Sequence, residues 1–233
     1  MKIRGLDFSY GDKLIFSGFD LDVPSGKSLC IMGGSGTGKT TLVNCICRQL
    51  DFGGDIDFED EKSKIAYVFQ QPRLIPSMSV EDNIKFVLPK GMDKISIANK
   101  VDRVIAQLRL EDCRKSYPSK ISGGQASRTA IARAMVTDCD LLILDEPFKG
   151  LDVKLKREII DILINLIEGK SVIFITHDPE EALAIGDRIC VFERNSGEGV
   201  RIKGEIEISQ CKSQRDMYGE YINNLRQKAY EIL

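Results

Sequence analysis

The sequence has no apolar run near the ~18 residues that a membrane-spanning helix needs, and its first residues lack the charged and then apolar pattern of a secretory signal. An excess of one charge is missing as well, because 33 Lys and Arg stand against 35 Asp and Glu and neither sign forms long blocks. Such a balance does not predict nucleic acid as a partner. We therefore expect a cytoplasmic chain whose partners must be inferred from its sites.

Cysteine motifs are also absent, although the 233 residues include seven cysteines. None of them forms a C-x-x-C pair, and their odd number fits neither a disulfide framework nor a zinc site. Reduced and mostly buried thiols are expected instead. No internal repeat, low-complexity tract or linker divides the chain. With 42% hydrophobic and 29% charged residues, the sequence predicts one domain with an ordinary core.

A glycine-rich segment is the strongest local signal. The apolar run over residues 28–32 predicts a strand before it, and residues 41–47 are typical of a helix after it, so the match to G-x-x-x-x-G-K-[ST] has the context that it needs. Backbone N–H groups and the helix start then converge on phosphate, Lys39 reaches the β- and γ-phosphates, and Thr40 ligates Mg²⁺. The alternative is a glycine-rich turn that happens to precede Lys-Thr. We predict a nucleoside triphosphate site made of Gly33, Gly34, Ser35, Gly36, Thr37, Gly38, Lys39, Thr40 and Thr41.

Two carboxylates follow the most apolar of the predicted strands. The run of Leu and Ile over residues 141–144 is typical of a parallel strand that is covered on both faces, and Asp145 and Glu146 come directly after it. Beside a P-loop, the first carboxylate is expected to hold the Mg²⁺ shell and the second to polarise an attacking water. Structural carboxylates at a helix start are the weaker alternative.

Two further polar residues stand at strand ends. Gln70 follows the strand predicted over residues 64–69, and His177, the only histidine, follows the strand predicted over residues 171–176. Open α/β sheets bind their ligands at the carboxyl ends of parallel strands. Both residues are therefore site candidates, with Gln70 suited to contact a metal and a water. A solvated loop glutamine and a histidine that merely fills space are the alternatives.

The alternation typical of strands disappears from residue 79 to about residue 136. Helical spacing over residues 97–108 gives one apolar face, so a helical insert in an α/β domain is expected. Ser122 is predicted to cap the next helix, with Gln125 at its third position in a capping box. A helix start with two glycines also offers a second seat for phosphate, made of Ser122, Gly123, Gly124 and Gln125.

Short strands are predicted near both ends of the chain. Apolar alternation broken by glycine and proline predicts antiparallel strands in the first thirty residues, with Tyr10 in their first turn, where its ring either stacks on a base or lies at the surface. Residues 51–55 are expected as a turn and residues 56–58 as a short strand. Strands over residues 188–193 and 200–208 precede a last helix whose packed face comprises Tyr218, Ile222, Leu225, Ala229 and Ile232.

In this order, the motifs resemble those of the ATP-binding cassette family over nearly the whole chain. The matching positions are Tyr10 as the aromatic residue that stacks on adenine, Gly33 to Thr40 as the Walker A loop, Gln70 as the Q-loop, Ile121 to Gln125 as the signature, Asp145 and Glu146 as Walker B with its adjacent glutamate, Leu151 and Asp152 as the D-loop, and His177 as the switch histidine. The departures are Ile121 for the usual Leu, Ala126-Ser127 where charged residues are frequent, and Phe148-Lys149-Gly150 before the D-loop.

The resemblance implies a fold and a division of the chain. It implies an α/β fold with a P-loop NTPase (RecA-like) core, a mostly parallel sheet, an N-terminal antiparallel β subdomain and an inserted helical subdomain. Residues 1–233 would form a single nucleotide-binding domain, and the helical subdomain would span about residues 79–136.

The resemblance also implies a head-to-tail dimer that binds ATP and Mg²⁺. ATP would lie between the Walker A loop of one cassette and the signature of the other. The γ-phosphate would be contacted by Lys39, Gln70 and His177 of one chain and by Ser122 and Gly124 of its partner.

The remaining site residues have separate roles under the same resemblance. Glu146 would be the general base toward water, Asp152 would contribute to the nucleotide site through the D-loop, and Mg²⁺ would be held by Thr40, Gln70 and Asp145. The activity implied is hydrolysis of ATP to ADP and phosphate, coupled to transmembrane transport.

The partners expected from the resemblance are a second cassette, membrane permease subunits and an extracytoplasmic solute-binding protein. The chain would then lie peripherally on the inner face of the cell membrane. Residues 71–84 resemble the corresponding loop of importer cassettes in the nitrate, sulfonate and taurine group. The alternatives are the energising subunit of an exporter or lipoprotein-release system, and a soluble ATPase associated with DNA or ribosomes.

Overall fold

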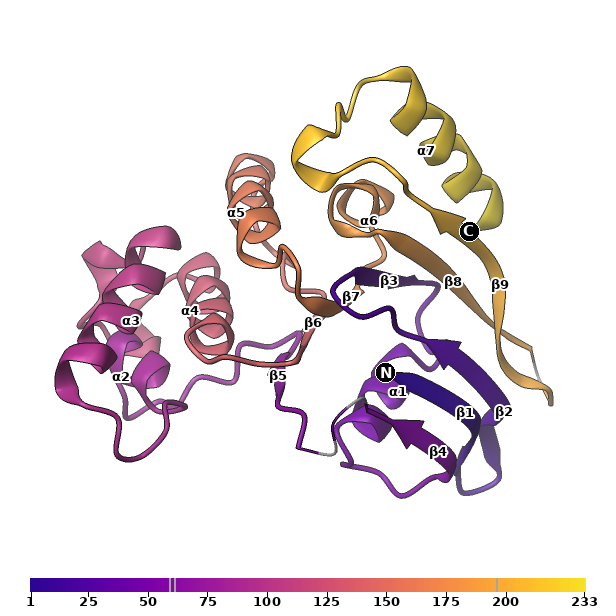
Figure 1. The fold of residues 1–233 in the computed structure, drawn as a ribbon, viewed down its shortest axis with the longest axis horizontal. Helices are drawn as coiled ribbons and strands as arrows, with labels where there is room; N and C mark the ends of the chain where they lie inside the picture. The colour runs from indigo at the N-terminus through magenta and orange to yellow at the C-terminus, as the bar shows by residue number, and fades with distance from the viewer. Residues whose placement is uncertain (59, 61, 196) are drawn as a thin grey trace.

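A six-stranded sheet forms the centre of the computed structural model, which describes residues 1–58, 60, 62–195 and 197–233 (Figure 1). Its strand order is β5-β6-β7-β3-β8-β9, and the first five strands of that order run parallel while β9 pairs antiparallel with β8. The strands are β3 (Ser28–Met32), β5 (Ile65–Val68), β6 (Leu141–Asp145), β7 (Ser171–Ile175), β8 (Arg188–Asn195) and β9 (Gly199–Glu207). The mostly parallel sheet predicted from the sequence is confirmed.

A second sheet has the order β2-β1-β4 and is antiparallel, as predicted. It comprises β1 (Lys2–Tyr10), β2 (Lys13–Asp22) and β4 (Gly53–Asp57). The turn expected over residues 51–55 is wrong in its second half, because β4 begins at Gly53. A Cβ on Gly54 would lie 2.1 Å from the carbonyl oxygen of Gly5, so this glycine permits close approach of the two strands.

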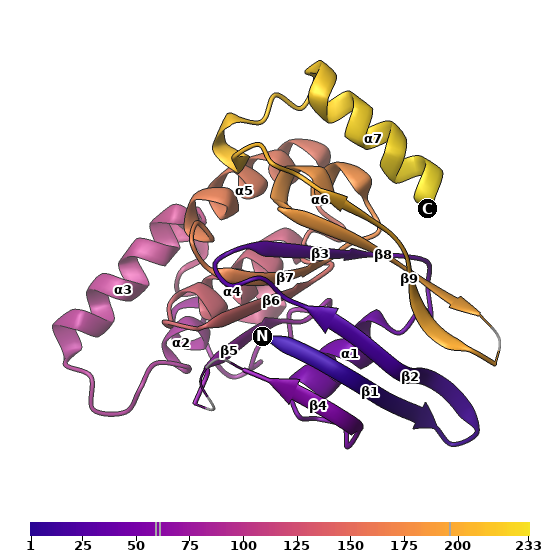
Figure 2. The same ribbon diagram turned by 45° about the vertical axis from the view of Figure 1, so that its right-hand side comes forward.

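The six-stranded sheet separates two apolar cores. In β3, Leu29 and Ile31 face one core, whereas Cys30 and Met32 face the other, as the pleat requires. Figure 2 shows α1 (Lys39–Ile46) with the antiparallel sheet on one side and α5 (Val153–Leu166) with α6 (Pro179–Ile185) on the other. Burial on both faces explains the continuous apolar runs of the central strands.

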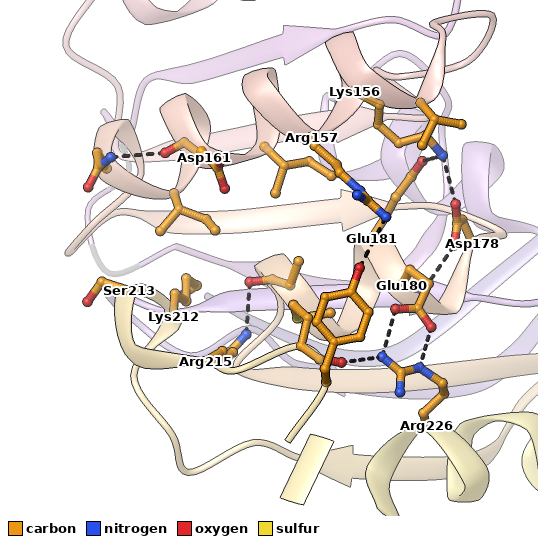
Figure 3. Close-up of a pocket in the computed structure, with 17 residues that line it drawn as sticks. Lys156, Arg157, Asp161, Asp178, Glu180, Glu181, Lys212, Ser213, Arg215 and Arg226 are labelled. Carbon is orange, nitrogen blue, oxygen red and sulfur yellow. Dashed lines mark hydrogen bonds and ion pairs between the residues drawn. The ribbon is translucent and has the colours of Figure 1, made fainter. Parts of the chain in front are cut away.

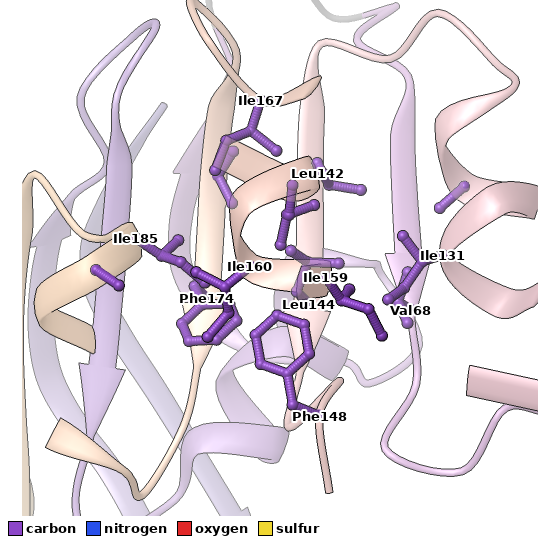
Figure 4. Close-up of a cluster of buried hydrophobic side chains, with 14 of the residues drawn as sticks. Val68, Ile131, Leu142, Leu144, Phe148, Ile159, Ile160, Ile167, Phe174 and Ile185 are labelled. Carbon is purple, nitrogen blue, oxygen red and sulfur yellow. The ribbon is translucent and has the colours of Figure 1, made fainter. Parts of the chain in front are cut away.

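The larger core lies on the helical side of the sheet. Figure 4 shows Leu144 of β6 and Phe174 of β7 packed with Phe148 beneath α5. The rings of Phe148 and Phe174 are 5.8 Å apart between centroids. Phe148 lies two residues after Glu146, so its burial fixes the chain just beyond the predicted Walker B residues.

The chain between β5 and β6 forms the helices α2 (Val80–Lys85), α3 (Lys94–Gln107) and α4 (Gly123–Met135), with short 3₁₀ turns at Glu111–Cys113 and Pro118–Lys120. These helices lie together at one end of the molecule in Figure 1. The apolar face expected on α3 is buried at Val101, Val104 and Ile105. Among the described residues, none of the helices is long and apolar enough to cross a membrane.

A 3₁₀ turn at Lys212–Gln214 precedes the last helix, α7 (Glu220–Ile232), which begins later than its expected apolar face requires. Ile222 and Ala229 are buried, but Tyr218 precedes the helix and is 75% exposed, so its assignment to the packed face is wrong. The N–H of Tyr218 donates to the side chain of Asp216, and Gly219 stands at the helix N-cap. A turn therefore replaces the first helical turn that the spacing suggested.

Candidate nucleotide site

The glycine-rich loop connects β3, at the middle of the sheet, to the start of α1. Two of its glycines are required by close contacts with the neighbouring strands β8 and β9. A Cβ on Gly33 would lie 2.4 Å from the carbonyl oxygen of Phe192, and one on Gly38 would lie 2.8 Å from Cγ2 of Val200. Both glycines also have positive φ, 141° and 85°. The loop is therefore packed closely against β8 and β9, in a backbone conformation that glycine adopts readily.

Lys39 folds back over this loop. Its Nζ donates to the carbonyl oxygens of Gly33 and Gly34 at 2.8 and 2.7 Å and to Oγ1 of Thr37 at 3.2 Å. Burial lowers the pKa of Lys39, although the nearby Glu146 and Asp145 act in the opposite direction. The ammonium thus lies inside the loop, where it can meet the charge of a phosphate.

Thr41 is a less direct candidate for nucleotide contact. It lies in the first turn of α1 and is 9% exposed, so much of its surface is already covered by protein.

Asp145, at the end of β6, accepts hydrogen bonds from two hydroxyls at the same oxygen. Oγ1 of Thr40 is 3.4 Å from Oδ2, and the hydroxyl of Tyr67 is 3.2 Å from it. Burial raises the pKa of Asp145, partly offset by these hydroxyls. Carboxylate and hydroxyl oxygens are the ligands that Mg²⁺ prefers, so the donor set of Thr40 and Asp145 fits that ion.

Tyr67 was missed as a site residue by sequence reasoning, which treated it only as part of a strand. A tyrosine in a buried strand needs a partner for its hydroxyl, and that requirement is the signal that could have identified Tyr67 as a site residue. Its pKa is raised, first by burial and then by Asp145. Tyr67 therefore holds the carboxylate from the neighbouring strand β5.

Glu146 contacts polar side chains that follow two other strands of the sheet. Its Oε2 accepts a hydrogen bond from Nε2 of Gln70 at 2.8 Å, and its Oε1 lies 3.4 Å from Nδ1 of His177. Glu146 has a φ of 43°, in the left-handed region that a residue with a Cβ seldom occupies, and such strain concentrates at functional sites. The structure thus brings together the polar residues predicted at the ends of β5, β6 and β7.

Lys149 is a second residue that sequence reasoning did not place in the site. Its Nζ lies 3.3 Å from Oε2 of Glu146, three residues before it, and its N–H donates to the carbonyl oxygen of Glu146. Burial raises the pKa of Glu146, but Lys149 and His177 outweigh burial and hold that pKa below its ordinary value. Lys149, which departs from the family pattern, therefore contacts the Glu146 carboxylate itself.

The segment predicted as the signature lies at the start of α4, on the helical side of the sheet. Ser122 forms the predicted capping box: its Oγ accepts from the N–H of Gln125 at 3.2 Å, and its own N–H donates to Oε1 of Gln125 at 2.9 Å. Ser122 and Gly123 are exposed. Because α1 lies on the opposite face, one chain does not bring this segment onto its own glycine-rich loop.

The predicted D-loop lies against the signature segment. A Cβ on Gly124 would lie 3.2 Å from Cδ2 of Leu155 and 3.3 Å from Cδ2 of Leu151. Asp152 caps α5, with its Oδ1 accepting from the N–H of Leu155 at 3.0 Å. Asp152 therefore has a structural role here beside the one predicted for it.

Tyr10 ends β1 and is 49% exposed. It packs edge-on against Phe8, with the ring centroids 4.8 Å apart. A half-exposed tyrosine at a strand end is available to stack on a base.

Comparison with known protein families bears directly on this geometry. A family model described as ABC transporter matches residues 16–149, more than half of the chain. The chain belongs to the ABC transporter family. A second model, described as an AAA domain, putative AbiEii toxin, matches the shorter segment 124–184.

Curated relatives of this ABC cassette match most of its length. An aliphatic sulfonates import ATP-binding protein of Burkholderia lata is 34% identical over 218 residues, which cover 89% of this chain and 77% of that protein. A sulfate/thiosulfate import ATP-binding protein of Neisseria meningitidis serogroup B is 38% identical over 239 residues, which cover 94% of this chain and 65% of that protein.

A solved structure shares the fold. The dimeric post-hydrolysis state of the ATP-binding cassette MJ0796, bound to ADP and Pi, has a TM-score of 0.77 and 27% identity, covering 90% of this chain and 99% of that one. The family and fold expected from the motifs are confirmed. The chain is an ATP-binding cassette that hydrolyses ATP with Mg²⁺ as its cofactor.

Proposed function

We propose that this cassette energises an importer of a small solute by closing and opening as a dimer around ATP. The observation that carries the chemistry is the contact of Gln70 and His177 with Glu146, because it gathers a base and two polar side chains at one strand edge. Import is favoured by the names of the relatives, which include sulfonate, sulfate/thiosulfate and spermidine/putrescine import proteins. These names agree on import and differ in solute.

The residue roles that we propose are those implied by the family resemblance, and the contacts described above support them. Lys39 and the loop N–H groups bind the phosphates. Thr40, Gln70 and Asp145 would hold Mg²⁺, which would supply positive charge to neutralise the phosphates. Glu146 accepts the proton of the attacking water, and His177 holds the carboxylate and the γ-phosphate in place.

The second half of each site comes from a partner cassette. Ser122, Gly123, Gly124 and Gln125 lie exposed or half-exposed at the start of α4, away from the loop of their own chain. In a head-to-tail dimer this helix start meets the γ-phosphate bound by the other chain. Tyr10 stacks on the base of the nucleotide, and Asp152 contributes to the site through the D-loop. The dimeric state of the similar solved cassette supports this arrangement.

A membrane permease is the further partner that we propose. Residues 1–233 form a single nucleotide-binding domain, in which the helical subdomain at about residues 79–136 and the loop before it receive the permease. Phe86 and Val87, at the end of α2, are 61% and 39% exposed and offer apolar surface there. The cassette would then lie at the cytoplasmic face of the membrane, in a system that also includes a solute-binding protein.

Co-purification from native membranes tests this proposal. A polytopic membrane protein recovered with the tagged cassette, together with ATP hydrolysis stimulated by a solute-binding protein, is the expected result. A membrane partner that needs no solute-binding protein would indicate the exporter or lipoprotein-release alternative. Stimulation by DNA or ribosomes, with no membrane partner recovered, would overturn the transport proposal.

A further inference from the structure

Lys156 lies one turn into α5 and forms two ion pairs with the segment that follows His177. Its Nζ is 2.8 Å from Oδ2 of Asp178 and 2.7 Å from Oε1 of Glu181 (Figure 3). The Lys156 side chain is only 25% exposed, and that of Glu181 only 7%. Charge pairs this well covered resist screening by salt and hold a defined geometry better than surface pairs do.

The same contacts extend to the residue that precedes His177. Oγ1 of Thr176 donates to Oε2 of Glu181 at 2.5 Å and accepts from the N–H of Asp178 at 3.0 Å. Thr176 is 1% exposed. Both sequence neighbours of the histidine are thus tied to Lys156, one directly and one through Glu181, whereas the imidazole itself is 67% exposed.

Lys156 is also bonded to the D-loop. The N–H of Lys156 donates to the carbonyl oxygen of Asp152, which caps the same helix. Glu146, Lys156 and His177 also line one cavity of about 220 Å³. Burial raises the pKa of Asp178, but Lys156 and the backbone N–H groups of Glu180 and Glu181 together outweigh burial and keep that pKa below its ordinary value.

We propose that Lys156 is a positioning residue that fixes the His177 ring beside Glu146. An exposed imidazole has few contacts of its own, so its place is set by the backbone that carries it, and Lys156 restrains that backbone on both sides. Because Lys156 lies one helical turn from Asp152, the restraint originates on the helix that begins at the D-loop. The inference rests on the proposed function for the catalytic role of His177, but not for the position of the ring.

The single histidine gives a direct test in nucleotide-free protein. With histidine-selective isotope labelling, all imidazole signals in the NMR spectrum belong to His177. Lys156→Met should shift and narrow these signals toward those of a freely rotating ring, and Lys156→Arg should restore the wild-type positions. Lys154→Met removes an exposed lysine from the same helix and should leave the spectrum unchanged. Identical spectra for Lys156→Met and wild type would overturn the proposal.

Steady-state kinetics supply the second measurement. Lys156→Met should lower kcat for ATP hydrolysis on the order of tenfold or more, since small misplacements of a catalytic group have large effects, and should leave KM for ATP within about twofold. Lys156→Arg should recover most of kcat. Loss confined to KM, or no recovery with Arg, would contradict a positioning role.

Loss of the cation leaves two covered carboxylates unpaired, so folding is checked by circular dichroism. Glu181→Gln keeps the size of the side chain and weakens one of the two pairs, and it should shift the imidazole signals in the same direction by a smaller amount. A folded Glu181→Gln variant with a wild-type spectrum would count against the proposal. His177→Ala separates the two ideas: wild-type turnover there would remove the proposed role of His177, while the spectra would still decide what Lys156 does.

Discussion

The strand edge at Glu146 and the start of α4 differ in how much of a site each completes within one chain. At the strand edge, Gln70 and His177 come from two other strands and both contact Glu146. At the start of α4, Ser122 and Gln125 bond to each other in a capping box, and Ser122 is exposed. Folding of one chain already assembles the first region. The second region is the start of a helix, and its exposed surface can still contact another chain.

Because of this difference, substitutions in the two regions should disable different sites of the dimer. A change at the strand edge should disable chemistry in the chain that carries it. A change at the start of α4 should disable the site of the other chain, because that helix start would act only across the dimer.

The largest effect is expected at the strand edge. Glu146→Gln removes the proposed base and should reduce ATP hydrolysis by a factor of ~10²–10⁴. ATP affinity should change little, because the loop and Lys39 remain. Steady-state hydrolysis and titration with a fluorescent nucleotide measure the two quantities separately.

The matched control for this variant is Glu168→Gln, which removes an exposed carboxylate after α5. It should hydrolyse ATP at the wild-type rate. Near wild-type turnover in Glu146→Gln would remove Glu146 from the role of base and leave the strand edge without one.

A mixing experiment tests whether the two regions act across chains. Ser122→Arg places a large cation at the start of α4 and should abolish hydrolysis by homodimers, as Glu146→Gln does. A mixed dimer of the two variants contains one intact site, in which Glu146 of one chain meets Ser122 of the other. Mixing two inactive proteins should therefore restore a substantial part of the wild-type activity.

Dilution provides the control for that experiment. If the site is shared, the specific activity of the wild type should fall as the protein is diluted into monomers, which should still bind ATP. Activity independent of concentration in a monodisperse monomer, or no recovery on mixing, would show that each chain works alone.

Both regions were foreseeable from sequence to the extent that their signals are local. The apolar run before Asp145 and Glu146 predicts a buried strand and puts both carboxylates at its end. Ser122 and Gln125 are three residues apart, so their capping box depends on one helical turn. Local patterns such as these can be recognised in the sequence without knowledge of the packing.

The contacts that escaped prediction join distant parts of the chain. Tyr67 reaches Asp145 from a neighbouring strand, and Lys156 reaches Asp178 from α5. Neither partner can be chosen until the order of strands and the packing of α5 on α6 are known. The turn predicted at Gly54 is wrong because a glycine that permits two strands to approach closely, as Gly54 does beside Gly5, looks the same in the sequence as a turn glycine.

The smallest expected effect separates stability from function at the start of α4. Ser122→Ala removes the side-chain cap and should lower the free energy of unfolding by about 1 kcal/mol. Asp93→Ala is the matched control, because Asp93 caps α3 by accepting from the N–H groups of Ile95 and Ser96. Both variants should lose similar stability in denaturant unfolding, but only Ser122→Ala should also lose ATP hydrolysis in the dimer. Equal hydrolysis by the two variants would reduce Ser122 to a helix cap and leave the start of α4 without a direct part in the site.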